Sequence, residues 1–126
     1  ISEETSKKMV KMLRKVVDKN DPMQGTARTA DINGYSVIGK TGTAVKVSKT
    51  SKGYSKDVMT VFVSAYPEEK PEYLLLVMID EPKAIPSKGY FKSDSGWNAV
   101  PTAGTIIKRI GPILVSKNYN IALNVK

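Results

Sequence analysis

The sequence predicts an α+β fold, an antiparallel sheet of three main strands accompanied by an N-terminal and a C-terminal helix. Three observations predict this class. Apolar residues recur at helical spacing near the start of the chain, and again after residue 100. Between these segments lie short β-prone runs that are separated by turn residues and are too closely spaced for parallel crossovers.

The length of 126 residues fits one domain or part of a larger one. Residue 1 is Ile and not an initiator Met, so we expect residues 1–126 to be a piece of a longer protein. The composition, 40% hydrophobic and 25% charged, is typical of a folded chain. There is no apolar run of 18 residues, and the acidic start Ile1-Ser2-Glu3-Glu4 does not resemble a signal peptide.

The first helix is predicted over residues 3–19. Ser2 is a good N-cap, and Glu3 and Glu4 suit the positive end of the helix dipole. Asn20-Asp21-Pro22 should end the helix. One face carries the apolar residues, which we interpret as core packing: Met9, Met12, Leu13, Val16 and Val17.

The three strands are predicted over residues 35–47, 58–66 and 73–80. Asn33-Gly34 is a strong turn signal before the first strand, and a lysine-rich polar loop over 48–57 follows it. The five residues between the second and third strands allow only an antiparallel hairpin. Residues 73–79 form a continuous apolar run, which predicts a strand buried on both faces.

A loop over residues 83–97 precedes a second helix, predicted over residues 101–115. Pro101 suits its first turn, and Gly111-Pro112 should end or kink it. The apolar face of this helix is formed by Ala103, Ile106, Ile107 and Ile110. In the tail, alternating apolar residues predict a short edge strand: Ile121, Leu123 and Val125.

The charge and the missing residue types restrict the possible functions. The net charge is +8, but the lysines between Lys40 and Asp57 are interspersed with Ser, Thr and Gly, with Tyr54 as the only aromatic residue. Single-strand binders need several stacking aromatics, so we expect a solvated loop and no nucleic-acid partner. The chain has no Cys or His, so acid–base chemistry would require a perturbed Lys, Asp or Glu.

One stretch is dense enough in glycines, hydroxyls and a cation to suggest chemistry, and it has two interpretations. Gly34–Thr41 matches the phosphate-loop pattern Gly-x-x-x-x-Gly-Lys-[Ser/Thr], which would make the chain a nucleotide-binding protein. Lys40-Thr41-Gly42 instead matches the Lys-Thr-Gly signature of penicillin-binding proteins and class A β-lactamases.

The surroundings favour the second interpretation. A phosphate loop needs a helix that begins at Lys40, whereas the residues on both sides of Lys40 are β-prone. On a strand at the sheet edge, Lys40 and Gly42 would face a cleft, and Thr41 and Thr43 would offer hydroxyl donors to a carboxylate. Asp80 and Glu81 have no His or Cys nearby, so we expect solvated carboxylates and no metal or other cofactor.

Several further motifs occur in a consecutive order around this stretch. The chain resembles the C-terminal part of the transpeptidase domain of class B penicillin-binding proteins, particularly the cell-division transpeptidases. The motifs that carry the resemblance cover nearly the whole chain: Gly25-Thr26-Ala27, Val37 to Ala44, Phe62 to Pro67, Leu76 to Pro82 and Gly96 to Gly104.

The resemblance implies a D,D-transpeptidase that cross-links peptidoglycan stem peptides and is acylated by β-lactams. It implies that Lys40, Thr41, Gly42 and Thr43 bind the substrate or β-lactam, and that the Thr43 backbone N–H is one of two oxyanion-hole donors. Implied partners are the remainder of the transpeptidase domain and divisome proteins. A parent anchored in the cytoplasmic membrane, with this domain outside it, is implied too.

The chain departs from the family pattern at the nucleophile. No serine has a lysine three residues later, so the Ser-x-x-Lys motif is absent from residues 1–126. Ser116-Lys117-Asn118 matches the second motif, Ser-x-Asn, but it follows Lys40 where the family motif precedes it. Because nucleophilic catalysis needs an activated nucleophile beside its base, we expect the isolated chain to be inactive.

Overall fold

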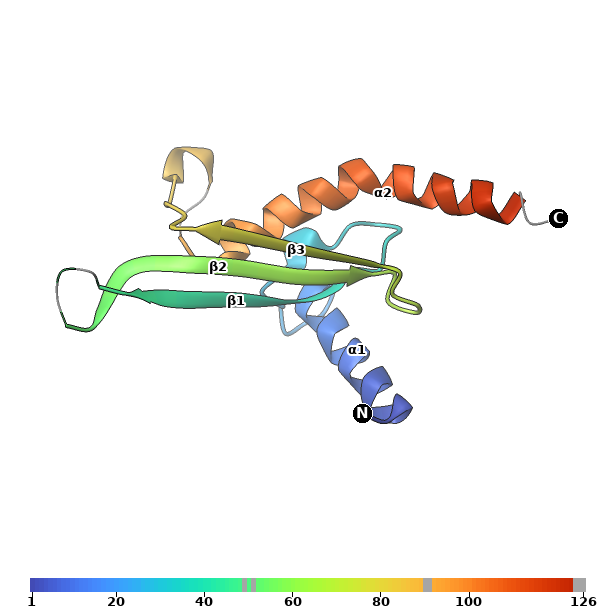
Figure 1. Ribbon diagram of the computed structural model, residues 1–126, viewed down its shortest axis with the longest axis horizontal. Helices are drawn as coiled ribbons and strands as arrows, with labels where there is room; N and C mark the ends of the chain where they lie inside the picture. Colours follow the sequence, from blue (N-terminus) through green and yellow to red (C-terminus); the bar gives the residue numbers. More distant parts are fainter. Residues whose placement is uncertain (49, 51, 90–91, 124–126) are drawn as a thin grey trace.

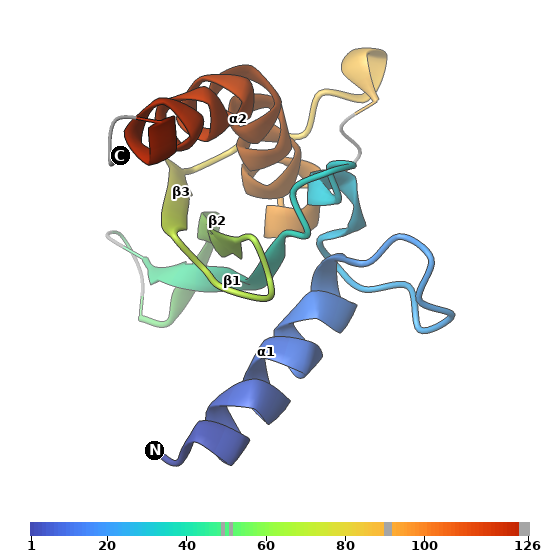
Figure 2. The same ribbon diagram turned by 90° about the vertical axis from the view of Figure 1, so that its right-hand side faces the viewer.

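The computed structural model describes residues 1–48, 50, 52–89 and 92–123 and confirms the predicted α+β class (Figure 1). Five main elements follow in order, α1 (Glu3–Val17), β1 (Ile38–Val47), β2 (Tyr54–Tyr66), β3 (Tyr73–Asp80) and α2 (Ala99–Leu123). Single 3₁₀ turns lie between them, η1 (Arg28–Ala30), η2 (Pro86–Lys88) and η3 (Ser95–Trp97). The two helices lie on opposite sides of the sheet (Figures 1 and 2).

Helix α1 begins as predicted, because the Ser2 side chain accepts a hydrogen bond from the backbone N–H of Thr5. It ends at Val17, two residues before the predicted limit, where Asp18 leaves helical geometry. Only this C-terminal end of α1 lies against the sheet, and the N-terminal end projects away from it (Figure 1). Helix α1 therefore supports the start of β1 and leaves most of the sheet uncovered.

The sheet has the strand order β1-β2-β3, and both pairs are antiparallel, as predicted for the second pair. β1 begins at Ile38, so the prediction that residues 35–37 belong to it was wrong. The backbone N–H of Tyr35 donates to Ile32 O in a turn, and Ser36 has a φ of 43°, which no strand residue adopts. Strand β2 starts at Tyr54, so part of the predicted lysine-rich loop is paired strand.

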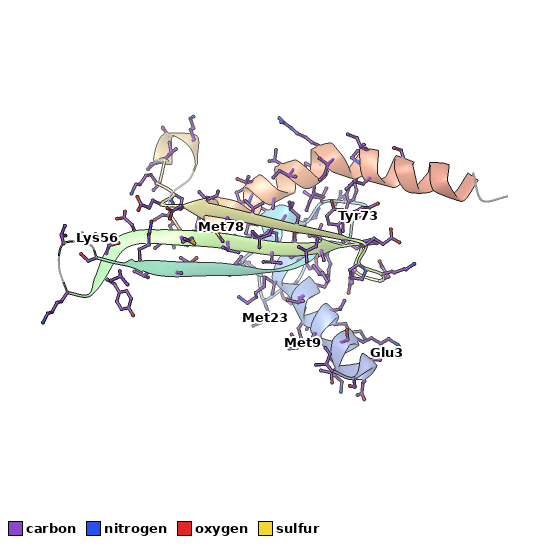
Figure 3. The ribbon with its side chains drawn as sticks, viewed as in Figure 1. Glu3, Met9, Met23, Lys56, Tyr73 and Met78 are labelled. Atoms are coloured by element: carbon purple, nitrogen blue, oxygen red, sulfur yellow. The ribbon has the colours of Figure 1, made fainter. Side chains whose placement is uncertain are left out.

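The inner face of the sheet packs under α2 and forms the core. Phe62 of β2 and Val77 of β3 are buried there against Val100 and Ile107 of α2. Tyr73, labelled in Figure 3 between the sheet and α2, donates a hydrogen bond from its hydroxyl to Leu114 O at 3.4 Å. These contacts hold α2 along the sheet and fix the position of the loop that precedes it.

The outer face of the sheet is largely uncovered in the described residues. Leu74, Leu76 and Met78 of β3 are 73%, 51% and 55% exposed. The prediction that β3 is buried on both faces was therefore wrong for these residues, because only α2 packs on the sheet along its length. A continuous apolar run indicates two faces that avoid water, and here one of them has no cover.

The predicted core role of the apolar face of α1 was wrong for two of its five residues. Val17 is buried and Leu13 and Val16 are half-buried, but Met9 and Met12 are exposed. Met9 lies on the part of α1 that projects away from the sheet (Figure 3). No described helix is long and apolar enough to cross a membrane.

Helix α2 is longer than predicted at both ends, since it starts at Ala99 and continues through Pro112 to Leu123. Of the two outcomes predicted for Gly111-Pro112, an end or a kink, the first was wrong because the helix does not end there. The proline removes one hydrogen bond, but Gly111 lies against the Tyr35 ring, where a Cβ would collide with it, and Leu114 packs on the core. Ile121 and Leu123 are helical, which contradicts the predicted tail strand, and Val125 lies outside the described residues.

Candidate functional site

Strand β1 presents the motif residues to two different sides of the sheet. Successive side chains of a strand alternate, so Thr41 and Thr43 share the inner face and Lys40 and Gly42 share the outer face. The pairing agrees with this, because Thr41 lies opposite the buried Phe62 and Thr43 opposite the buried Thr60. The site residues predicted from the sequence are therefore contiguous but not on one face.

A hollow of about 400 Å³ lies beside the inner face of β1. Three segments enclose it, the loop and η1 turn after α1, the motif strand, and the loop with η3 before α2. Its lining includes Thr41 and Thr43 but neither Lys40 nor Gly42, so the hollow brings together two of the four predicted site residues. The lining residues are Gln24, Gly25, Thr26, Arg28, Thr29, Thr41, Thr43, Asp94, Ser95, Gly96 and Trp97.

The first wall of the hollow contacts the motif through Thr26. Its Oγ1 lies 3.0 Å from Thr41 Oγ1, a hydrogen bond in which either hydroxyl can donate. The backbone of this wall rests on the end of α1, where the Ala27 N–H donates to Val16 O at 2.9 Å. Gly25 is needed here because a Cβ would collide with the carbonyl oxygens of Lys15 and Val16.

The opposite wall contacts the motif through Ser95. Its backbone N–H donates to Thr43 Oγ1 at 3.3 Å, and its own hydroxyl donates to Val61 O at 2.6 Å. Ser95 is buried, with 1% of its surface exposed. Asn98 holds this loop in place, since its amide nitrogen donates to Ser93 O at 3.0 Å and to Asp94 O at 2.7 Å.

These contacts decide what the Thr43 hydroxyl can offer to a ligand. A hydroxyl has one proton, and the oxygen of Thr43 already accepts from the Ser95 N–H. The proton of Thr43 remains available as a donor. A pair of hydroxyl donors on one strand, with Arg28 lining the same hollow, suits an anionic oxygen pair such as a carboxylate.

Two large side chains outside the motif strand also line the hollow. Arg28 Nη1 donates to Gln24 Oε1 at 3.3 Å, and both residues are part of the lining. Trp97 lines the hollow while remaining 36% exposed. Ser95 was not singled out at all, because its role depends on a loop that returns to β1 from 52 residues away.

Lys40 lies on the outer face and is exposed, with its Nζ donating to Thr41 O at 2.9 Å. It lies within strand β1, where a phosphate loop would need the first turn of a helix. Gly34 has a φ of 88° and belongs to the preceding turn. The nucleotide-binding alternative for Gly34–Thr41 was therefore wrong, because the helix N-terminus that would hold the phosphates is replaced by a strand.

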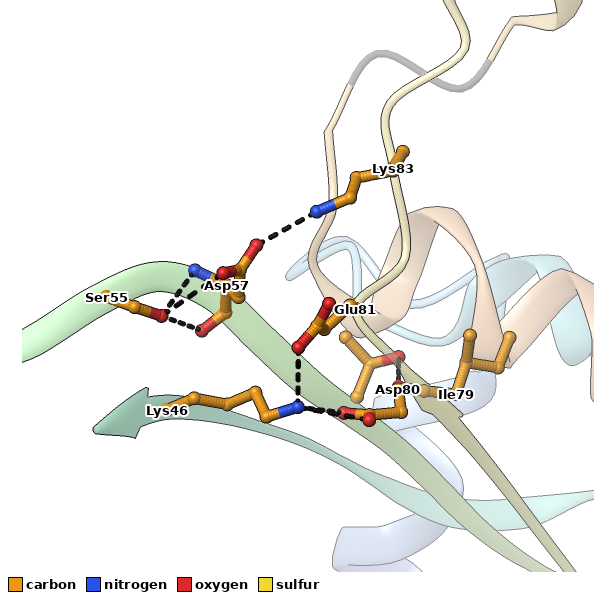
Figure 4. A network of polar contacts seen from close by, with 8 residues as sticks. Lys46, Ser55, Asp57, Ile79, Asp80, Glu81 and Lys83 are labelled. Carbon is orange, nitrogen blue, oxygen red and sulfur yellow. Dashed lines mark hydrogen bonds and ion pairs between the residues drawn. The ribbon is translucent and has the colours of Figure 1, made fainter. Parts of the chain in front are cut away.

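A polar network lies at the far end of the sheet (Figure 4). Lys46 reaches across β2 and binds Asp80 at 2.9 Å and Glu81 at 2.7 Å, so the prediction that these carboxylates are only solvated was wrong. The bonds to Glu81 and Asp80 raise the pKa of Lys46. Beside them, the Lys83 ammonium lowers the pKa of Asp57. No group of metal-ligating side chains that could hold an ion occurs among the described residues.

Comparisons of this chain with family models, curated proteins and solved structures all match the same protein family. The penicillin binding protein transpeptidase domain matches residues 1–108. The probable peptidoglycan D,D-transpeptidase FtsI of Caulobacter vibrioides is 36% identical over 119 residues, which are 90% of this chain and 20% of that protein. Stage V sporulation protein D of Bacillus subtilis is 37% identical over 108 residues, 86% of this chain and 15% of that protein.

Solved structures show the same likeness. Penicillin-binding protein 3 of Mycobacterium tuberculosis, complexed with ampicillin, matches with a TM-score of 0.68 and 30% identity over 88% of this chain and 25% of that one. The transpeptidase domain of penicillin-binding protein 3 from Burkholderia pseudomallei has a TM-score of 0.67 and 31% identity, covering 90% of this chain and 31% of that one. The chain thus spans a third or less of each of these proteins.

Proposed function

The chain belongs to the penicillin-binding protein transpeptidase family, and we propose that residues 1–126 carry the substrate-binding strand of a longer D,D-transpeptidase. It is part of a peptidoglycan D,D-transpeptidase domain of the FtsI and penicillin-binding protein 3 type. In the proposal, the whole protein cross-links stem peptides, and β-lactams acylate it. The neighbours from Mycobacterium tuberculosis, which were solved with ampicillin and with aztreonam, support this class of ligand.

The observation that carries the proposal is the pair of hydroxyl donors on β1. Thr41 and Thr43 project into one hollow, and the walls of that hollow hold both oxygens by hydrogen bonds. A carboxylate on a stem peptide or a β-lactam accepts two such bonds at once. In the proposal the Thr43 backbone N–H is an oxyanion-hole donor, and Gly42 leaves room for the substrate backbone.

Lys40 has a separate role in the proposal because it lies on the other face of the strand. Its ammonium would raise the electrostatic potential on the outer side of β1, where the nucleophile of the longer protein would approach. This side of the sheet is the one that lacks cover, as the exposure of Leu76 and Met78 indicates. We therefore propose that the remainder of the transpeptidase domain, with its Ser-x-x-Lys and Ser-x-Asn motifs, packs on this face.

The location of the longer protein belongs to the same proposal. We propose a parent that is anchored in the cytoplasmic membrane with this domain outside it, where peptidoglycan is assembled. Divisome proteins would meet the parent there. The likeness to FtsI of Caulobacter vibrioides supports this assignment.

Labelling with a fluorescent penicillin tests whether the nucleophile lies outside residues 1–126, in the remainder of the longer protein. The longer protein should take one covalent label, whereas residues 1–126 alone should take none, because they contain no Ser-x-x-Lys. Stoichiometric labelling of the isolated chain at a serine would overturn the proposal.

Substitution of the two threonines tests the binding strand directly. In the longer protein, Thr41→Val or Thr43→Val should weaken non-covalent penicillin binding by about 10- to 100-fold, as expected for a lost hydrogen bond to a charged group. Thr102→Val on the exposed side of α2 is the matched control and should change nothing. Unchanged affinity in both strand variants would remove the β1 hydroxyls from the site.

A further inference from the structure

We propose that Thr26 is a positioning residue for the carboxylate site, whose hydroxyl donates to Thr41 and so directs the Thr41 proton toward the ligand. The inference rests on the proposed function, because it names a residue outside the Lys-Thr-Gly-Thr strand that prepares that strand for an anion. It starts from the 3.0 Å distance between Thr26 Oγ1 and Thr41 Oγ1.

The backbone around Thr26 is fixed on both sides, which gives the hydroxyl a defined position. Ala27 is fully buried and its N–H is bound to Val16 O, and Gly25 fits against the end of α1 where a side chain would not. On the far side, Gly96 approaches so closely that a Cβ there would lie 3.0 Å from Thr26 O. Thr26 is thus held between the end of α1 and the η3 loop, where it lines the hollow.

Counting protons gives the direction of the Thr26–Thr41 hydrogen bond once an anion is bound. An anionic oxygen has no proton, so the Thr41 hydroxyl must donate its only proton to it. The oxygen of Thr41 can then only accept from Thr26, and the Thr26 hydroxyl must be the donor. Donation from Thr26 polarises the Thr41 hydroxyl and strengthens its bond to the anion.

The second threonine of the motif has the same arrangement with a different donor. The backbone N–H of Ser95 donates to Thr43 Oγ1 at 3.3 Å and leaves the Thr43 proton for the ligand. Each motif hydroxyl therefore has a donor behind it, one from the loop after α1 and one from the loop before α2. Two such donor chains side by side match the two oxygens of a carboxylate and would be poorly matched to an ester.

The test compares benzylpenicillin with its methyl ester on the full-length protein. Non-covalent affinity and the rate of acylation are measured separately by stopped-flow. Thr26→Val keeps the shape of the side chain and removes the hydroxyl, and it should weaken benzylpenicillin binding by about 3- to 10-fold. The acylation rate constant and the affinity for the ester should not change, because the Thr26 hydroxyl acts only through the carboxylate.

Two further variants separate positioning from a loss of structure. Thr26→Ser restores the hydroxyl and should recover the affinity of the unmodified protein. Thr102→Val removes a hydroxyl on the exposed side of α2, outside the hollow, and it should leave both ligands unaffected. Equal losses for the acid and the ester in Thr26→Val, or no recovery with serine, would overturn the inference.

Thr41→Val distinguishes this inference from the proposed function. If Thr41→Val weakens binding of the acid and Thr26→Val does not, the role of Thr26 is refuted and the β1 site stands. If neither Thr41→Val nor Thr43→Val changes the preference for acid over ester, the proposed site itself is refuted.

Discussion

The buried hydroxyl of Thr60 on β2 donates to Asn98 Oδ1 at 2.7 Å, joining the middle of the sheet to the first turn of α2. The same oxygen accepts from the backbone N–H of Ala99 at 2.7 Å, and the amide nitrogen donates to the backbone of the preceding loop. One side chain therefore caps α2, satisfies a buried hydroxyl and fixes the loop that carries Ser95. The wall of the hollow opposite Thr26 depends on it.

Replacing Asn98 should loosen this wall and destabilise the fold. Asn98→Ala removes the acceptor of the Ala99 N–H and leaves the Thr60 hydroxyl with only its longer bond to Ile79 O among the described residues, so the free energy of unfolding should fall by about 1–3 kcal/mol. Urea unfolding measures the loss. Asn98→Asp keeps the acceptor for Thr60 and Ala99 and should lose less, whereas an equal loss in both variants would contradict the role of Oδ1.

Arg14 should be the most sensitive charged residue of α1. Its guanidinium donates to Val37 O at 2.8 Å and binds Asp31 at 2.9 Å, and Asp31 is 7% exposed. Among the described residues, Arg14→Met would leave that carboxylate with the Lys19 backbone N–H as its remaining partner, and it should lower the free energy of unfolding by about 2–4 kcal/mol. Thermal and urea unfolding check the value.

The control for Arg14 is Lys7→Met on the same helix. Lys7 pairs with Glu3 at 2.7 Å, but both side chains are more than 70% exposed, so the change should fall within about 0.5 kcal/mol. A similar loss of unfolding free energy in Arg14→Met and Lys7→Met would show that the burial of Asp31 does not make its ion pair more stabilising than an exposed one.

The sequence predicted those parts of the fold that local signals determine. Ser2 caps α1 as expected, the Asn33-Gly34 turn lies where predicted, and β3 has its predicted limits. Each of these depends on a few neighbouring residues. That α2 does not end at Pro112 was not predictable, because the core contacts that keep it helical past the proline come from distant residues such as Tyr35.

The site was predictable only where a motif marked it. The resemblance marked Thr41 and Thr43, and the pleat of β1 separates their side chains from that of Lys40. Thr26 and Ser95 contact them from 15 and 52 residues away, and no local pattern reports such contacts. The small residues on both sides of Thr26 were a usable signal, since Gly25 is needed for close packing on α1.

Stability at high pH should depend on Lys46. Its bonds to Glu81 and Asp80 raise its pKa above the ordinary lysine value of 10.5. Below that value both the folded and the unfolded chain hold the proton, so the stabilisation is fully present. As the pH rises further, the unfolded state loses its proton first, and the stabilisation is lost as the pH passes the pKa of the folded state.

Unfolding in urea at about pH 8 and at about pH 11 tests whether the stabilisation by Lys46 decreases as the pH rises. Lys46→Met should reduce the loss of stability between the two pH values, because it removes a group whose pKa differs between the states. Lys56→Met on the exposed side of the same hairpin is the matched control and should leave the loss unchanged. A steeper loss in Lys46→Met would contradict the direction of the shift.

The uncovered outer face should make residues 1–126 associate when they are prepared alone. Leu74, Leu76 and Met78 form an apolar row on β3, which is also an edge of the described sheet. Sedimentation velocity over a range of concentrations should show association, and Leu76→Lys should reduce it without lowering the melting temperature. Ile113→Lys, an equally exposed apolar residue on α2, is the control and should leave association unchanged.

Replacing Gly39 or Gly42, the glycines on either side of Lys40 and Thr41, with alanine should change the free energy of unfolding in different ways. A Cβ at Gly39 would lie 2.6 Å from Val63 O and 2.7 Å from the ring of the buried Phe62. Neither the strand backbone nor a buried ring can move aside cheaply. Gly39→Ala should therefore lower the free energy of unfolding by about 1–3 kcal/mol or more, as measured in urea.

Gly42 has open space on the same strand, because its nearest neighbour would be Val61 Cβ at 3.9 Å. Gly42→Ala should leave the stability unchanged or raise it by about 0.5–1 kcal/mol, since glycine is unfavourable within a strand. In the longer protein it should nevertheless weaken penicillin binding, because a methyl group would occupy the space proposed for the ligand backbone. A stable Gly42→Ala variant with full affinity would show that the ligand does not approach β1 at this residue.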